Sequence, residues 1–142
     1  EMRDTDGQGR MKLPGKVIDI FNNEPVHQLA TSSKAGVPNV CSVGAKYLLD
    51  DETIIVVDNY FKKTLANIVE NPVVAILVRS GKESFQIKGR CRYVTSGPVY
   101  EQARKWMKEK KDTYPAKGAL EIKVEEIFDS TPGNGAGNRI TE

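Results

Sequence analysis

The chain has 142 residues, of which 39% are hydrophobic and 28% charged, a composition typical of one globular domain rather than a disordered chain. The 21 lysines and arginines nearly balance the 19 aspartates and glutamates, which argues against a protein whose main partner is nucleic acid. With one histidine and two cysteines, neither in a C-x-x-C pair, the sequence contains no zinc motif or disulfide framework, and we expect no metal site.

The longest hydrophobic run, residues 73–78, is far shorter than the roughly 20 residues that a membrane span needs. Near the start, no stretch resembles a secretory signal. We therefore expect a cytoplasmic protein that has no membrane partner.

In the first half of the chain, a short helix is expected after Pro14, because Val17, Ile20 and Phe21 would share one of its faces. A strand over 26–32 follows, and residues 34–38 supply the glycine and proline of a hairpin turn. Residues 39–49 alternate with a period of two, which predicts one continuous strand.

Residues 53–57 are β-branched and predict a buried strand, after which a helix is expected over 61–70. Its expected apolar stripe consists of Phe61, Leu65, Ile68 and Val69. The remaining segments predict a buried strand over 73–78, an alternating strand over 83–95, a helix opening at 96–98 and a strand over 119–128.

Together these segments give a mainly β protein with about six strands, three short helices and no internal repeat. Because consecutive strands are joined by tight turns, we expect a six-stranded antiparallel barrel with helices at its rim. The barrel domain is expected to cover residues 12–129. Residues 1–11 are expected to lie outside it, and residues 130–142 to form a glycine-rich tail.

The strongest functional signal is the first turn of the expected second helix, where Lys62, Lys63 and Thr64 follow a buried strand. The helix dipole favours anions there, so two lysines in this turn break a local rule. Free helix N–H groups, two ammonium groups and a hydroxyl would together bind a phosphate. Two ordinary surface lysines explain the pattern equally well.

Ser42 and Gly44 are small residues on one face of the strand over 39–49, which would let a flat ring approach the backbone. A bulge or bend at Gly44 is the simpler explanation. The tail sequence GNGAGN is similar to a dinucleotide fingerprint but opens no expected helix, so it does not predict a nucleotide site.

His27 is interpreted as a structural histidine, and Cys41 and Cys91 as inert core thiols. Lys88, Arg90 and Arg92 form a basic stripe on the outer face of the strand over 83–95. This stripe is either a solvated face or a rim of positive potential for an anionic ligand.

Four segments carry a family resemblance: LPGKVIDIF, LATSSKAGVPNVCSVG, DNYFKKTLANIVENPVVAILV and FQIKGRCRYVTSGPVYE. In this order and spacing, over nearly all of residues 12–128, the chain resembles the FMN-binding split-barrel superfamily that includes pyridoxamine 5'-phosphate oxidase. The likeness is greatest to its small stand-alone FMN-binding proteins. The resemblance implies a split β-barrel and a homodimer that holds non-covalent FMN at the subunit interface.

The resemblance also implies roles for particular residues. The isoalloxazine ring would lie against Ser42, Val43 and Gly44, and the phosphate against the segment that begins with Asp58 and Asn59 and ends with Lys62, Lys63 and Thr64. From the partner subunit, Gln86 and Lys88 would face the flavin. Asn134 and Arg139 are weaker candidates in the tail, which resembles tails that reach the other subunit.

An FMN-dependent oxidoreductase is therefore the expected function, with a small molecule or a protein as electron donor or acceptor. The resemblance does not include the arginine-containing substrate segment of true pyridoxamine 5'-phosphate oxidases. Three alternatives remain: pyridoxamine phosphate oxidation, electron transfer without substrate turnover, and a module that binds haem or a deazaflavin. The catalytic residues are not assigned.

Overall fold

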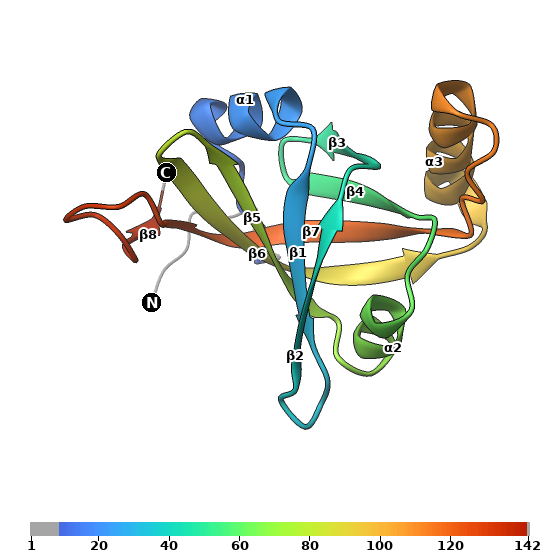
Figure 1. Ribbon diagram of the computed structural model, residues 1–142, viewed down its shortest axis with the longest axis horizontal. Helices are drawn as coiled ribbons and strands as arrows, with labels where there is room; N and C mark the ends of the chain where they lie inside the picture. Colours follow the sequence, from blue (N-terminus) through green and yellow to red (C-terminus); the bar gives the residue numbers. More distant parts are fainter. Residues whose placement is uncertain (1–8, 142) are drawn as a thin grey trace.

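A computed structural model describes residues 9–141, and its centre is a curled antiparallel sheet (Figure 1). The strand order is β2-β1-β5-β6-β7-β4-β3, and β8 pairs with β7. The strands are β1 (His27–Ser32), β2 (Pro38–Val43), β3 (Lys46–Asp50), β4 (Thr53–Asp58), β5 (Val73–Ser80), β6 (Glu83–Val94), β7 (Gly118–Asp129) and β8 (Arg139–Ile140). The helices are α1 (Gly15–Asn23), α2 (Lys63–Glu70) and α3 (Gly97–Lys110).

The two strands that end the sheet, β2 and β3, are consecutive in the chain. β2 pairs with β1 and β3 pairs with β4, so the short connection between them joins the two ends of the sheet covalently. The structure is therefore a split barrel, as expected. The expected count of six strands is wrong, because the run 39–49 divides at Gly44 and Ala45, and because β8 was not expected.

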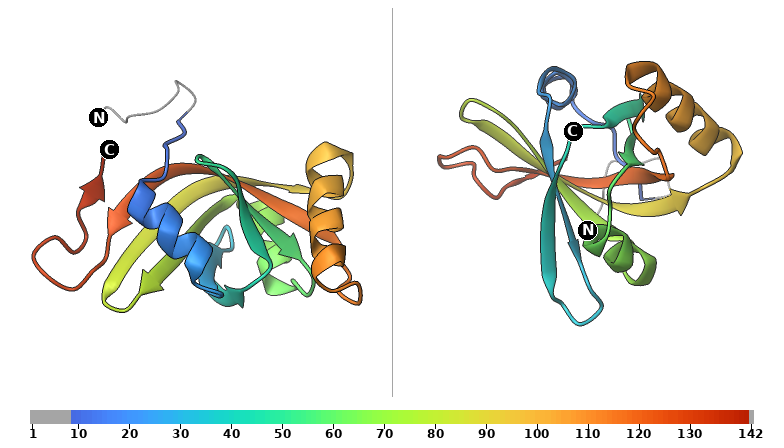
Figure 2. Two further views of the ribbon diagram at one scale, coloured as in Figure 1. Left: turned by 90° about the horizontal axis from the view of Figure 1, so that it is seen from above. Right: turned by 45° about the vertical axis from the view of Figure 1, so that its right-hand side comes forward.

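The helices surround this barrel at separate places (Figures 1 and 2). α3 lies at one end of the long axis, α1 lies over the middle of the molecule next to β5, and α2 lies beside the β1–β2 hairpin, which projects away from the sheet. The predicted face of α1, made of Val17, Ile20 and Phe21, is buried in the barrel core. That part of the prediction is confirmed.

Every residue of β4 is buried, because the strand has a packed layer on both faces. Ile54 and Val56 belong to the barrel core, whereas Ile55 and Val57 pack with Met107 in a second cluster beneath α3. This two-sided burial explains the continuous β-branched sequence. β5 differs from its expected full burial, since its residues alternate and Val73 is 41% exposed.

The long β6–β7 ladder contains a bulge between Lys88 and Gly89. A side chain at position 89 would collide with the backbone carbonyl of Lys123, so this position requires glycine. The basic stripe of β6 is matched by acids on β7: Arg92 Nη2 lies 2.7 Å from Glu121 and Arg90 Nε lies 3.6 Å from Glu125.

The boundaries of the expected domain also differ from those observed. Met11 is 3% exposed and its N–H donates to Val124 O, so the fold begins before residue 12; the expectation for residues 1–8 lies outside the described part of the chain. At the other end, the tail folds back on its own β7, where Arg139 and Ile140 form β8. Within residues 9–141, none of the helices is both long and apolar enough to cross a membrane.

Candidate functional site

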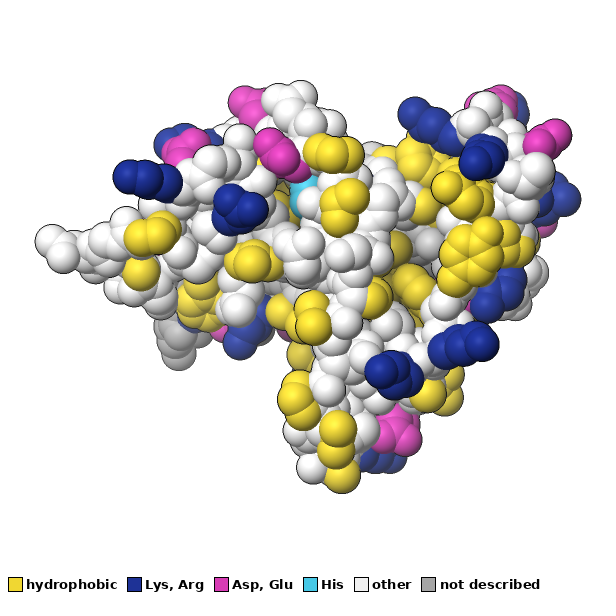
Figure 3. Space-filling model, viewed as in Figure 1, with side chains coloured by type: hydrophobic (Ala, Val, Ile, Leu, Met, Phe, Trp, Pro, Cys, Tyr) yellow, Lys and Arg dark blue, Asp and Glu magenta, His cyan; other side chains and the backbone are white. Residues whose placement is uncertain are grey.

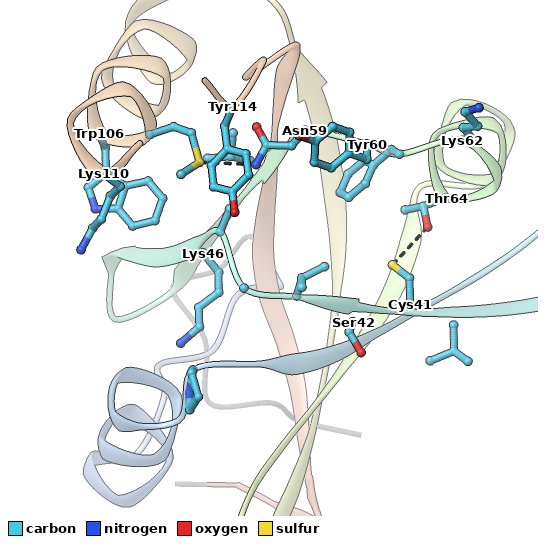
Figure 4. A pocket seen from close by; sticks show the side chains of 18 of the residues that line it. Cys41, Ser42, Lys46, Asn59, Tyr60, Lys62, Thr64, Trp106, Lys110 and Tyr114 are labelled. Atoms are coloured by element: carbon cyan, nitrogen blue, oxygen red, sulfur yellow. Dashed lines mark hydrogen bonds between the residues drawn. The ribbon is translucent and has the colours of Figure 1, made fainter. Parts of the chain in front are cut away.

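A groove of about 850 Å³ lies where the β2–β3 connection meets the start of α2 and the inner side of α3 (Figure 4). Figure 3 shows hydrophobic and basic side chains gathered on this face of the molecule. The groove is open along one side, and its volume falls in the range of sites for organic ligands.

One wall of the groove is the run from Asn39 to Lys46. Ser42 and Gly44 are exposed along it, whereas Val43 is 6% exposed and directs its side chain into the barrel core. A methyl group at Gly44 would lie 3.5 Å from Pro25 O, an ordinary contact, so the fold does not itself require glycine here. This wall therefore offers backbone groups and small side chains to a ligand.

At the adjoining wall, α2 begins without any side-chain cap at Lys62. The first N–H groups of a helix have no partner within it, so this turn directs unpaired donors outward. Lys62 and Lys63 are exposed there and line the groove. The expected helix start at Phe61 is wrong by two residues, because the Phe61 N–H donates to the Asp58 carboxylate instead. Val69, expected on the buried stripe, is 75% exposed.

Thr64 also borders the groove but is only 4% exposed. Its Oγ1 accepts a hydrogen bond from Asn39 Nδ2 at 3.1 Å and lies 3.3 Å from Cys41 Sγ. The hydroxyl thus ties α2 to β2. Cys41 lies in the groove wall rather than in the core interior, whereas burial raises the pKa of Cys91 to about 11, as suits an inert thiol.

Asp58, which ends β4, and Asn59, which follows it, differ in position. Asp58 is fully buried and does not line the groove; its carboxylate accepts from Phe61 N–H and from the Tyr93 hydroxyl. Asn59 does line the groove, and its side chain accepts from Ala116 N–H at 3.0 Å and lies 3.4 Å from Met107 Sδ. The structure therefore brings together Ser42, Val43, Gly44, Asn59, Lys62, Lys63 and Thr64.

Besides Asp58, four expected residues lie away from this groove. Gln86 and Lys88 are on β6, where the Lys88 ammonium sits 5.4 Å from the centre of the Phe128 ring. Asn134 lies in the exposed loop before β8, and Arg139 Nη2 lies 3.9 Å from Glu126. A role for these residues at the flavin stays a prediction that needs a second subunit.

Sequence reasoning missed the third wall, which α3 and the residues after it provide. Trp106 lies on α3, half-buried beside the groove with its ring 4.8 Å from that of Tyr47. Lys110 and Tyr114 line the same wall, as does Tyr60. Their only sequence signal was a lysine-rich helix end next to aromatic residues, which predicts an ordinary solvated surface.

The groove has a positive potential, since Lys46, Lys62, Lys63 and Lys110 line it and Glu24 is the one acid among the described lining residues. Two of the three hydrogen-bond donors of the Lys46 ammonium are already used, because they donate to Phe21 O and Glu24 O at the end of α1. The donor set fits an anionic group at α2, and the aromatic and small side chains fit a flat ring.

His27 does not line the groove. The ring is 1% exposed, and its Nε2 donates to Phe21 O at 3.0 Å. Burial, together with the nearby Lys46 ammonium, lowers its pKa to about 4. These contacts agree with a structural histidine. Within residues 9–141, no cluster of His, Cys, Asp and Glu could hold a metal ion.

A sequence model of the pyridoxamine 5'-phosphate oxidase family matches residues 13–130. Among curated proteins, an uncharacterized protein of Methanocaldococcus jannaschii is 37% identical over 139 residues, which cover 96% of this chain and 93% of that protein. The pyridoxine/pyridoxamine 5'-phosphate oxidase of Rippkaea orientalis is 30% identical over 110 residues, covering 70% of this chain and 51% of the oxidase. The match thus spans about half the length of that oxidase.

Among solved structures, HupZ of Group A Streptococcus is 29% identical, with a TM-score of 0.77 over 88% of this chain and 99% of that one. An FMN-binding protein from Syntrophomonas wolfei has a TM-score of 0.69 at 19% identity, covering 78% and 80% of the two chains. HutZ, a haem storage protein from Vibrio cholerae, has a TM-score of 0.67 at 18% identity, covering 84% and 95%. The last two likenesses concern the fold alone.

Proposed function

Because the chain belongs to the pyridoxamine 5'-phosphate oxidase family, we propose that it binds FMN non-covalently in the groove and acts as an FMN-dependent oxidoreductase. The observation that carries this proposal is the uncapped first turn of α2, where Lys62 and Lys63 face the same groove as the open wall at Ser42 and Gly44. A phosphate and a flat ring would each find a matching wall.

The phosphate would be held by Lys62, Lys63 and the free N–H groups that open α2. Thr64 would support this turn through its bond to Asn39 rather than by reaching outward. The ring would lie along the run 42–45, where backbone groups are accessible, with Trp106 and Tyr114 across the groove. Bound FMN supplies the hydride or electron transfer, while the protein orients the ring and limits its contact with water.

We further propose a homodimer, in which Gln86 and Lys88 of each chain would approach the other chain's groove. Two features support this arrangement: the groove is open on one side, and the valines at positions 37 and 40 of the adjoining hairpin are 63% and 64% exposed. Large exposed apolar side chains that cluster beside a site are typical of an interface.

The alternatives make different demands on the same groove. Pyridoxamine phosphate oxidation is favoured by the 30% identity to the Rippkaea orientalis oxidase and would require a second phosphate site. Haem binding is favoured by the shared fold of HutZ, but His27 is buried away from the groove and could not reach an iron atom there without rearrangement.

The test is a flavin titration of the purified chain, preceded by a visible spectrum of the untreated protein. FMN should bind more tightly than riboflavin, which lacks the phosphate. Replacing Lys62 and Lys63 by alanine should weaken FMN binding by roughly 10- to 100-fold, since charge-assisted hydrogen bonds contribute about 1.5–3 kcal/mol. Riboflavin binding should stay the same.

The matched control replaces the exposed Lys82 and Lys105, which lie outside the groove, and so removes the same total charge. It should leave both affinities unchanged. A protein that binds neither flavin would contradict the proposal. A titration with haemin, and one with pyridoxamine 5'-phosphate monitored for peroxide release by the FMN-loaded protein, separate the alternatives.

A further inference from the structure

Asp58 is a fully buried carboxylate at the end of β4, directly before the turn that leads into α2. Its Oδ1 accepts from Phe61 N–H at 2.8 Å, and its Oδ2 accepts from the Tyr93 hydroxyl at 2.5 Å. The Lys117 ammonium lies 3.9 Å from Oδ1. Burying a carboxylate is costly unless it is paired in this way, so the arrangement is a specific one.

The partners of Asp58 come from three parts of the chain. Phe61 is in the turn itself, Tyr93 is on β6 and Lys117 precedes β7. The backbone of Asp58 is held as well, because Lys117 N–H donates to its carbonyl at 2.8 Å. Across the ladder, Gly118 opposes Asp58, and any side chain at position 118 would occupy the space of the Tyr93 ring. The glycine at position 118 thus leaves the space that the Tyr93 hydroxyl occupies.

Tyr93 remains a proton donor across the physiological pH range. Burial raises its pKa, and the hydrogen bond to Asp58 and the charge of that carboxylate raise it further. The Tyr93 hydroxyl therefore keeps the proton that it donates to Asp58.

Neither Asp58 nor Tyr93 lines the groove, but every residue from Asn59 to Thr64 does. We propose that Asp58 and Tyr93 are positioning residues which fix the 59–62 turn, so that the first turn of α2 selects a phosphorylated flavin over an unphosphorylated one. This inference rests on the proposed function. It corrects the expectation that Asp58 contacts the cofactor: the carboxylate acts from behind the turn.

The physical reason is whether the entropic cost of ordering the 59–62 turn is met on folding or on ligand binding. In the intact protein, the turn is ordered on folding, so a phosphate meets donors that already point at it. Without the Tyr93 hydroxyl, the turn would be mobile in the free protein, and binding would have to order it. That cost falls on ligands that use the α2 turn. A ligand that contacts only the 42–45 wall would not bear it.

The test measures FMN and riboflavin affinities of Tyr93→Phe. We expect the FMN dissociation constant to rise about tenfold, corresponding to the loss of one hydrogen bond to a charged group, with the riboflavin constant unchanged within about twofold. Tyr100→Phe is the matched control, because it deletes a hydroxyl that donates to Ala116 O at 2.8 Å and not to Asp58. It should leave the FMN preference unchanged.

Asp58→Asn provides the conservative variant. Its amide can still accept from Phe61 N–H and can donate to the Tyr93 oxygen, so the preference for FMN should survive, whereas Asp58→Ala should lose it. Amide hydrogen exchange of the ligand-free protein gives a readout that needs no flavin. Exchange over residues 59–65 should be faster in Tyr93→Phe than in the wild type or in Tyr100→Phe.

The inference is overturned if Tyr93→Phe lowers both flavin affinities equally, or if it changes neither the affinities nor the exchange over 59–65. Failure of the proposed function looks different. A wild-type protein that does not distinguish FMN from riboflavin contradicts the phosphate assignment and the selectivity inferred here, while the exchange measurement still decides whether Asp58 and Tyr93 hold the turn.

Discussion

His27 shows what a single buried side chain does to the stability of this protein. Its pKa falls from 6.5 to about 4 on folding. Within that window an unfolded chain binds a proton that the folded protein excludes, so stability present above pH 6.5 is lost as the pH is lowered toward about 4. We expect the urea midpoint of the wild type to fall more steeply through this window than that of His27→Gln. Parallel curves would contradict this expectation, since the carboxylates are common to both proteins.

At the same scale, the sequence was informative about residue types and less so about their roles. Lys62 and Lys63 could be singled out because they break the dipole rule within one turn of helix. The role of Asp58 could not be predicted, because its partner Tyr93 is 35 positions away and only the curled sheet brings the two together. Trp106 was missed for the same reason, as its position depends on how α3 packs over β4.

The α2 helix illustrates a conflict between helix stability and ligand binding. Its N-terminus has no capping side chain and no acid in the first turn. Lys62→Asp should therefore stabilise the protein by about 0.5–1 kcal/mol, through a cap and a favourable dipole interaction. The same change should weaken FMN binding by at least tenfold, because it removes a cation and adds an anion beside the phosphate. Chemical unfolding and flavin titration of the same sample measure the two effects. A variant that is both more stable and tighter in FMN binding would contradict the assignment of this turn to the phosphate.

Elements were predicted well wherever local pattern determines them. The face of α1 and the buried strand β4 follow from periodicity and β-branching alone. The division between β2 and β3 follows only in part: the alternation of residues 39–49 continues through Gly44 and Ala45, and Gly44 alone indicated a bulge or bend. The break arises because β1 and β4, the partners of the two halves, diverge in space. β8 could not be predicted either, because two residues carry no detectable period.

For the whole molecule, the antiparallel barrel class followed from the sequence because tight turns join most of its strands. The pairing of β1 with β5 and of β4 with β7 could not be read from local pattern. The proposed dimer predicts that analytical ultracentrifugation gives twice the monomer mass. Val40→Glu should shift the flavin-free protein toward monomer, because it places a charge on an exposed apolar face of β2. Val69→Glu, at a more exposed valine on α2, is the control and should leave the mass unchanged.

The strands at the two ends of the sheet are one continuous run of chain, residues 38–50. Within residues 9–141 each of them pairs on one side only, and the free edge of β2 runs along the wall of the groove. An uncovered strand edge is a template on which further chains can assemble by β-pairing. We therefore expect a ligand bound in this groove to cover the edge of β2 and to lower the tendency of the protein to aggregate through that edge.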